Sequence, residues 1–189
     1  GPDIPEGWSL MQWINDEIDA AYSQKISIAE DMRGNDWITK MTGEGGTGFD
    51  SQWDADFHHK IVAALTAAND SDRNMFEIRD MIQSNYNGVD TQRVIYTESH
   101  DEVGDGEKPP GKFRVPSQID GDDPTSYYPK KRSTLGAVIV FTSPGIPMIF
   151  MGQEFLETGT WHDDTPLDWT NDTTFAGIKL MYQHLIGLR

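Results

Sequence analysis

Apolar positions along the chain alternate between helical spacing and short continuous runs. From residue 8 to residue 23 they recur every three or four positions, which predicts a helix with one apolar stripe. The run 25–31 is short, contains β-branched residues and ends in two acids, and its length and β-branched content favour a strand. The glycine-rich composition of residues 41–49 predicts a loop, and a second very short strand is expected at 52–54.

The same succession continues along the chain. Helical spacing predicts helices over residues 57–68 and 73–86. Residues 93–101 repeat the design of the first strand, because a β-rich run again ends in polar, ionisable side chains. The polar stretch 102–128 then reads as a long loop, of the length that is usually functional or mobile in a compact domain.

The remaining residues complete the alternation. A helix is expected over 130–141, a further apolar run that ends in polar groups over 148–154, and an amphipathic helix over about the last 15 residues. Strands that alternate with helices favour an α/β fold with a parallel sheet. The length of 189 residues favours one domain over 1–189.

Composition excludes several classes of partner. The formal net charge of −16 argues against nucleic acid, which is held mainly by Lys and Arg. Apolar runs stay shorter than the roughly 18 residues that a membrane span requires, so no membrane partner is expected. Because the chain has Cys 0, it can form neither a disulfide nor a thiolate metal site, which fits a reducing compartment and favours the cytoplasm.

Ionisable residues follow the predicted strands, and they are the main candidates for chemistry. Glu30 follows the first strand, His100 and Asp101 end the run 93–101, and Glu154 ends the run 148–154. Parallel strands bring their C-terminal ends to one face, where carboxylates suit general acid–base or charge-stabilising work. Alternatively, such acids cap the helices that follow.

No metal or other cofactor is expected. His58 and His59 are adjacent, so on a helix their side chains diverge by about 100° and cannot easily share a metal, which favours a surface pair. Residues 120–123 are acidic but lack the alternating ligands of a calcium loop, and a solvated turn is the safer interpretation.

Four segments carry a resemblance to a known family. Ser99-His100-Asp101-Glu102-Val103 resembles the motif that ends the seventh barrel strand in the α-amylase superfamily of glycoside hydrolases, and glycogen branching enzymes above all. Residues 26–31 are similar to the fifth-strand motif of that family. Residues 142–155 are similar to its eighth strand, and Pro166-Leu167-Asp168-Trp169 follows as in those enzymes.

This resemblance implies a role for each matching residue. Glu30 falls on the general acid/base, and Asp101 on the aspartate that stabilises the oxocarbenium-like transition state. His100 falls on the hydroxyl-binding partner of that aspartate, and Trp53, in the short sixth strand, is placed to stack on a sugar unless it is core. The implied substrates are α-1,4- and α-1,6-linked glucans.

The resemblance also implies what is missing. The nucleophilic aspartate of the family lies on the fourth strand in a Gly-Phe-Arg-x-Asp type motif, and nothing like it precedes Trp8. The chain therefore resembles the second half of a TIM (β/α)8 barrel, strands five to eight, and is expected to hydrolyse no glucan alone. The alternatives are a glucan-binding module without chemistry, and a half-barrel that pairs with itself as a homodimer through its open edges. Hydrolysis and glucan transfer are not separated.

Overall fold

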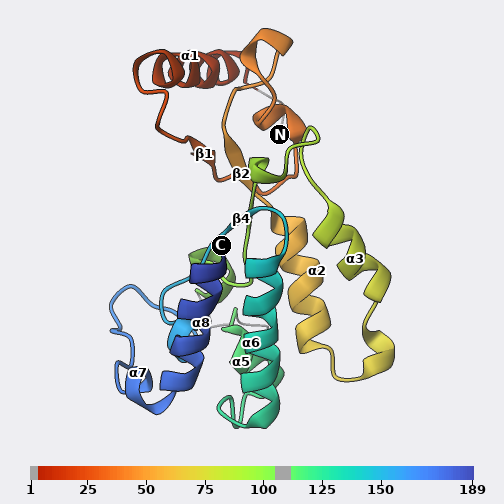
Figure 1. Ribbon diagram of the computed structural model, residues 1–189, viewed down its shortest axis with the longest axis vertical. Helices are drawn as coiled ribbons and strands as arrows, with labels where there is room; N and C mark the ends of the chain where they lie inside the picture. The colour runs from red at the N-terminus through yellow and green to blue at the C-terminus, as the bar shows by residue number, and fades with distance from the viewer. Residues whose placement is uncertain (1–3, 105–111) are drawn as a thin grey trace. The chain divides into compact units, whose positions relative to one another are not determined.

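The described part of the chain forms two compact units. The computed structural model describes residues 4–104 and 112–189, and Figure 1 labels their elements. Unit 1 comprises residues 4–56, 83–95 and 144–146, and unit 2 comprises residues 57–82, 96–104, 112–143 and 147–189. The expectation of a single domain over 1–189 stays a prediction.

Unit 1 is built around a small sheet. Its strands are β1 (Ile28–Ala29), β2 (Ser51–Trp53), β3 (Arg93–Ile95) and β4 (Ile146–Pro147), in the order β1-β2-β3-β4 (Figure 1). β1 pairs with β2, and β2 with β3, in parallel. The α/β class and the parallel sheet predicted from the alternating pattern are therefore confirmed.

Helix α1 (Pro5–Ala21) confirms the first predicted helix. It begins earlier than the apolar spacing indicated, with a proline in its first turn. The helix tolerates proline there because amide groups of the first turn make no hydrogen bond within the helix, so the missing amide hydrogen costs nothing. Polar side chains attach it to the following loop: Asn15 donates to the Thr47 carbonyl at 2.7 Å, and Gln12 to the Gly46 carbonyl at 2.7 Å. The apolar stripe is only partly covered, since Ile14 is exposed.

Unit 2 is mainly helical. Its elements are α2 (Ala55–Thr66), whose first two residues belong to unit 1, α3 (Met75–Gln83), whose last residue does, α4 (His100–Val103), α5 (Val115–Ile119), α6 (Tyr127–Thr142), α7 (Asn171–Thr174) and α8 (Ala176–Leu188). Helix α6 packs against both α5 and α8 (Figure 1). The helices predicted from spacing over 57–68, 73–86, 130–141 and the C-terminal residues are confirmed. None of the described helices is long and apolar enough to cross a membrane.

Three predictions about the strands and the long loop were wrong in extent. The strand expected over 93–101 ends at Ile95, because the polar residues after it are buried in side-chain bonds and α4 begins at His100. The expected loop 102–128 contains α5, and its residues 105–111 lie outside the described part. The run 148–154 is not a strand, since Gly152 has a left-handed φ of 91°.

Candidate functional site

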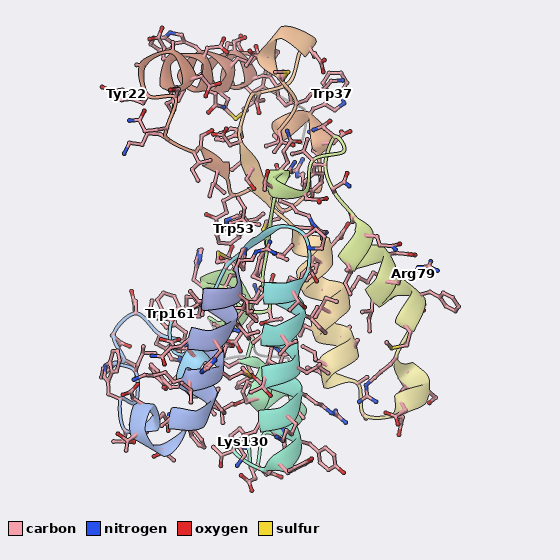
Figure 2. The ribbon with its side chains drawn as sticks, viewed as in Figure 1. Tyr22, Trp37, Trp53, Arg79, Lys130 and Trp161 are labelled. Atoms are coloured by element: carbon pink, nitrogen blue, oxygen red, sulfur yellow. The ribbon has the colours of Figure 1, made fainter. Side chains whose placement is uncertain are left out.

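In unit 1, Glu30 and Trp53 lie at the same edge of the sheet. Ile28 pairs with Ser51 and Ala29 with Gln52, so the next step of the register places Glu30 beside Trp53. Glu30 directly follows β1 and Trp53 is the last residue of β2, so both lie at the edge formed by the C-terminal ends of these parallel strands. Glu30 is exposed and Trp53 is half-buried, at the end of β2 (Figure 2). The strand-end position expected for Glu30 is therefore confirmed.

A buried ion pair supports this edge from the other face of the sheet. Asp54 follows Trp53, and its Oδ2 lies 3.2 Å from Nη1 of Arg93, with both side chains buried. Arg93 also donates to the Pro144 carbonyl oxygen from Nε at 3.2 Å and from Nη2 at 2.8 Å. This guanidinium therefore joins three segments of unit 1, and it fixes the backbone that carries Trp53.

In unit 2, His100 and Asp101 form the first turn of α4. His100 Nε2 lies 3.5 Å from Asp101 Oδ1, and about half of each side chain is exposed. Lys112 Nζ donates to the backbone carbonyl oxygen of Asp101. The pair is thus accessible to a polar ligand, as expected for sugar-binding groups.

Two residues before His100, a buried carboxylate was missed at the sequence level. Glu98 Oε2 lies 3.2 Å from Nη1 of Arg114, and its Oε1 accepts the Val115 amide at 2.8 Å. Burial raises the pKa of Glu98, while the Arg114 guanidinium and the Val115 amide oppose that rise. The sequence predicted only a β-rich run that ends in polar, ionisable residues, and nothing in it marked Arg114 as the partner of Glu98. This pair anchors the segment that leads into His100 and Asp101.

A second cluster was also missed, and it corrects the interpretation of the adjacent histidines as a surface pair. His58 is buried, and its Nε2 lies 3.3 Å from Glu102 Oε2. His59 is exposed, and its Nε2 lies 3.6 Å from Glu102 Oε1. The hydrogen bond from His58 is the main cause that lowers the pKa of Glu102 to about 2. Nothing in the sequence indicated that Glu102 contacts the two histidines, because they lie in separate segments of the chain.

Glu154 does not end a strand as expected. It lies in the short 3-10 turn Gln153–Phe155 and is half-buried, and its Oε2 accepts the Gly152 amide at 3.0 Å. Its carboxylate therefore holds its own turn, which favours the capping role over a catalytic one.

Sequence comparison supplies the family context of these residues. A 1,4-alpha-glucan branching enzyme of Pseudoalteromonas atlantica is 25% identical over 182 residues, which are 95% of this chain and 24% of that enzyme. The branching enzyme of Chlamydia pneumoniae is 28% identical over 169 residues, 89% of this chain and 22% of the enzyme. This chain is similar to part of the branching enzymes. The resemblance inferred from its motifs is confirmed.

Structural comparison agrees on the fold. A cyclic alpha-maltosyl-(1→6)-maltose hydrolase of Arthrobacter globiformis, in complex with maltose, superposes with a TM-score of 0.68 at 15% identity, covering 97% of this chain and 38% of the hydrolase. No protein-family model matches the chain. The chain spans about a quarter of the length of the branching enzymes it matches, so it corresponds to a partial catalytic region of them.

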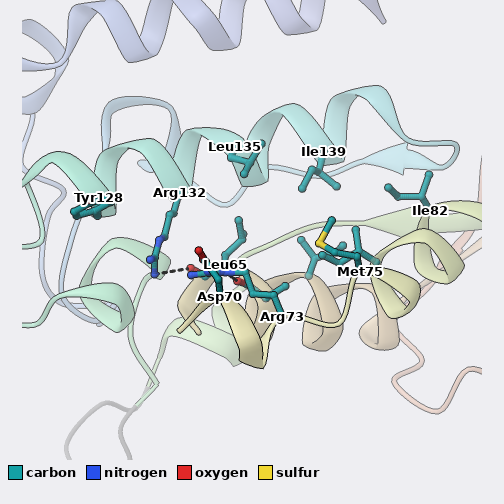
Figure 3. Close-up of a pocket in the computed structure, with 12 residues that line it drawn as sticks. Leu65, Asp70, Arg73, Met75, Ile82, Tyr128, Arg132, Leu135 and Ile139 are labelled. Carbon is teal, nitrogen blue, oxygen red and sulfur yellow. Dashed lines mark hydrogen bonds and ion pairs between the residues drawn. The ribbon is translucent and has the colours of Figure 1, made fainter. Parts of the chain in front are cut away.

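Unit 2 also contains an apolar pocket that the branching-enzyme motifs do not account for. It has a volume of about 550 Å³ and lies between α2, α3 and α6 (Figure 3). Leu65, Met75 and Leu135 are among the side chains that line it, and Arg132 closes one end by donating to the Leu65 carbonyl oxygen at 3.4 Å. The pocket offers little to a hydroxyl-rich sugar, which favours the strand-end residues as the carbohydrate site.

Proposed function

We propose that this chain is part of the catalytic region of an α-amylase-type enzyme that acts on α-1,4- and α-1,6-linked glucans. The observation that carries the proposal is the shared edge of β1 and β2, where Glu30 and Trp53 lie at the C-terminal ends of neighbouring parallel strands. Similarity to branching enzymes and a fold shared with a maltose-complexed hydrolase support the same substrate class.

Each residue of the proposed site has a distinct role. Glu30 protonates the departing glycosidic oxygen and later activates the water or the acceptor sugar. Asp101 stabilises the positive charge that develops on the sugar ring, and His100 binds a ring hydroxyl beside it. The half-buried indole of Trp53 offers a flat apolar face to the sugar.

These residues are proposed to correspond to strands five to eight of the barrel. The printed sequence contains no Gly-Phe-Arg-x-Asp motif, which carries the nucleophile in the family. A retaining reaction needs a carboxylic acid and a carboxylate nucleophile on opposite sides of the glycosidic bond. The 189 residues alone therefore bind glucan but neither hydrolyse nor transfer it.

The test measures binding and turnover on the same material. Isothermal titration of the chain with maltoheptaose should give saturable binding, because the sugar contacts do not need the nucleophile. Trp53→Ala and His100→Ala should each weaken it about five- to thirtyfold, since a well-placed stacking or hydrogen-bonding group contributes about 1–2 kcal/mol. The matched controls, Trp13→Ala and His184→Ala, should bind as the parent chain does.

Turnover is measured as release of reducing ends from amylose and as loss of its iodine colour. Neither change is expected with the pure chain. Turnover that disappears in Glu30→Gln would disprove the claim that these residues alone are inactive. Absence of maltoheptaose binding by the folded parent chain would disprove the proposed substrate class.

Two other expectations remain predictions. The sheet order leaves β1 and β4 with one neighbouring strand each among the described strands, which is compatible with the proposed homodimer through open edges. The cytoplasm remains the expected compartment because the chain has Cys 0.

A further inference from the structure

Three side chains from two helices of unit 2 converge outside the proposed catalytic residues. His58 and His59 lie in α2, and Glu102 lies in α4. One nitrogen of each imidazole and one carboxylate oxygen all lie within 4.8 Å of one another. Such a set of two imidazoles and a carboxylate is one that zinc prefers in proteins.

The spacing of these atoms suits a tetrahedral ion. Bonds of about 2.0–2.2 Å to zinc place neighbouring ligand atoms about 3.3–3.5 Å apart. Glu102 Oε2 lies 3.3 Å from His58 Nε2, and Glu102 Oε1 lies 3.6 Å from His59 Nε2. Each imidazole nitrogen therefore already lies close to this distance from an oxygen of the Glu102 carboxylate.

The adjacent histidines converge because both of them contact the Glu102 carboxylate. Their rings contact edge to face, with centroids 5.1 Å apart and planes at 72°. The buried His58 ring is held by stacking on Tyr96, with centroids 5.3 Å apart and planes at 23°. One ligand is thus fixed in advance, which lowers the entropy lost when a metal binds.

We propose that His58, His59 and Glu102 form a binding site for one Zn²⁺, with water in the remaining position. A pocket of about 320 Å³ lies at these residues and gives the water access from solvent. Bound there, the ion links α2 to α4. The site does not depend on the proposed glucan chemistry, because neither Glu30 nor Asp101 is a ligand.

Two features limit the affinity. Lys112 lines the same pocket, and its positive charge opposes a second cation, although Nζ donates to the Asp101 carbonyl. His58 Nδ1 is buried without a hydrogen-bond partner within residues 4–104 and 112–189, whereas a metal-bound imidazole usually donates from its second nitrogen. We therefore expect binding in the micromolar range rather than the tighter range of thiolate sites.

The test uses Co²⁺ as a spectroscopic probe and Zn²⁺ as its competitor. The metal-free 189-residue chain, shown to be folded by circular dichroism, is titrated with Co²⁺ while its visible absorption is recorded. One equivalent should give the intense bands of tetrahedral cobalt, and one equivalent of Zn²⁺ should abolish them. Zn²⁺ should also raise the melting temperature of the chain.

Variants assign the binding to these residues. His59→Gln and Glu102→Gln should each weaken Zn²⁺ binding at least about tenfold, as loss of a ligand or its support does. His184→Gln, an exposed histidine of α8, is the matched control and should bind as the parent chain does. Because His59 is also exposed, its variant keeps the fold and isolates the loss of a ligand.

Two outcomes would overturn the proposal. Failure of the folded parent chain to bind one equivalent of Co²⁺ or Zn²⁺ below about 1 mM would leave Glu102 as a hydrogen-bond acceptor only. Unchanged binding by both His59→Gln and Glu102→Gln would place the metal elsewhere, for example on the acidic surface. Weak octahedral cobalt bands would point to the same conclusion.

Discussion

The two units are stabilised in different ways. Unit 1 buries few apolar side chains, and these are mostly in or next to its short strands: Ala29, Ile38, Ala55, Val94 and Ile95. Polar side chains bonded to backbone supply much of its order, as Asn15 and Gln52 do through the carbonyls of Thr47 and Asn35. Unit 2 instead packs apolar side chains between helices, and its buried members include Phe57, Ile61, Val62, Leu65, Val103, Val140, Phe141, Phe155, Leu156 and Leu185. The stability of unit 1 therefore depends largely on hydrogen bonds, and that of unit 2 on the packing of buried apolar side chains.

A buried arginine–carboxylate pair nevertheless occurs in each unit. Arg93 and Asp54 form it in unit 1, and Arg114 and Glu98 in unit 2, each at 3.2 Å. A buried pair costs desolvation when it forms, but removal of one partner leaves an unpaired charge that is far more costly. In both units the pair stands next to a strand-end segment, so it holds proposed site residues in place.

The largest effect is expected from breaking these pairs. Arg93→Met and Arg114→Met should each lower the free energy of unfolding by about 3–5 kcal/mol, because a buried carboxylate loses the positive charge that compensates it. Arg93→Met should cost more, since the Pro144 carbonyl also loses its donors. Urea unfolding measures the total, and hydrogen exchange of peptides from each unit shows where protection falls.

Arg79→Met is the control for this comparison, because the Arg79 side chain is about half exposed and its carboxylate partner, Asp80, is exposed as well. Its loss should change stability by less than about 1 kcal/mol. If Arg114→Met lost protection in both units equally, the two units would unfold as one, and the contrast between them would not extend to cooperativity.

A smaller loss of stability is expected when a methyl group is added in the glycine-rich loop of unit 1 that contacts α1. A Cβ at Gly46 would lie 2.1 Å from the Lys40 carbonyl oxygen, whereas a Cβ at Gly43 meets nothing within 4 Å. Gly46→Ala should therefore cost about 1–3 kcal/mol, by forcing the backbone apart and disturbing the bond from Gln12. Gly43→Ala is the matched control, and equal stability of the two variants would show that this loop does not support α1.

Sequence patterns predicted the long helices of unit 2 more accurately than the short strands of unit 1. The helices α2, α6 and α8 were predicted well, because periodic or apolar segments of more than about ten residues favour a helix over a strand. Strands of two or three residues, such as β1, are too short for a period, so their bounds were overestimated. For α1, spacing gave the helix but not its attachment, which depends on Asn15.

The candidate site was predictable where motifs carry it. Glu30, His100, Asp101 and Trp53 came from local sequence and from a family resemblance, and both are visible in the chain itself. The pairing of Glu98 with a distant arginine was not visible, because charge partners far apart in sequence leave no periodic signal. The same holds for Glu102 in α4, which contacts two histidines of α2, a helix separated from α4 in sequence by α3.

The smallest effect concerns two tyrosines with a raised pKa, the half-buried Tyr86 of unit 1 and the buried Tyr182 of unit 2. Burial raises the pKa of Tyr86 in unit 1, and the neighbouring Asp54 and Asp56 raise it further. Burial also raises the pKa of Tyr182 in unit 2. A phenol whose folded pKa exceeds its unfolded value of about 10 adds stability below pH 10, and this stability is lost as the pH rises further.

Phenolate absorption tests these raised pKa values. Tyr86 and Tyr182 should ionise only as the chain unfolds in alkali, because the pKa of each phenol is raised in the folded chain. Tyr182→Phe should leave stability at pH 7 within about 0.5 kcal/mol, because its hydroxyl has no hydrogen-bond partner in the described ranges, and should reduce alkaline sensitivity. Reversible ionisation of Tyr182 near pH 10 in the folded chain would show that unit 2 is less tightly packed there than its buried side chains imply.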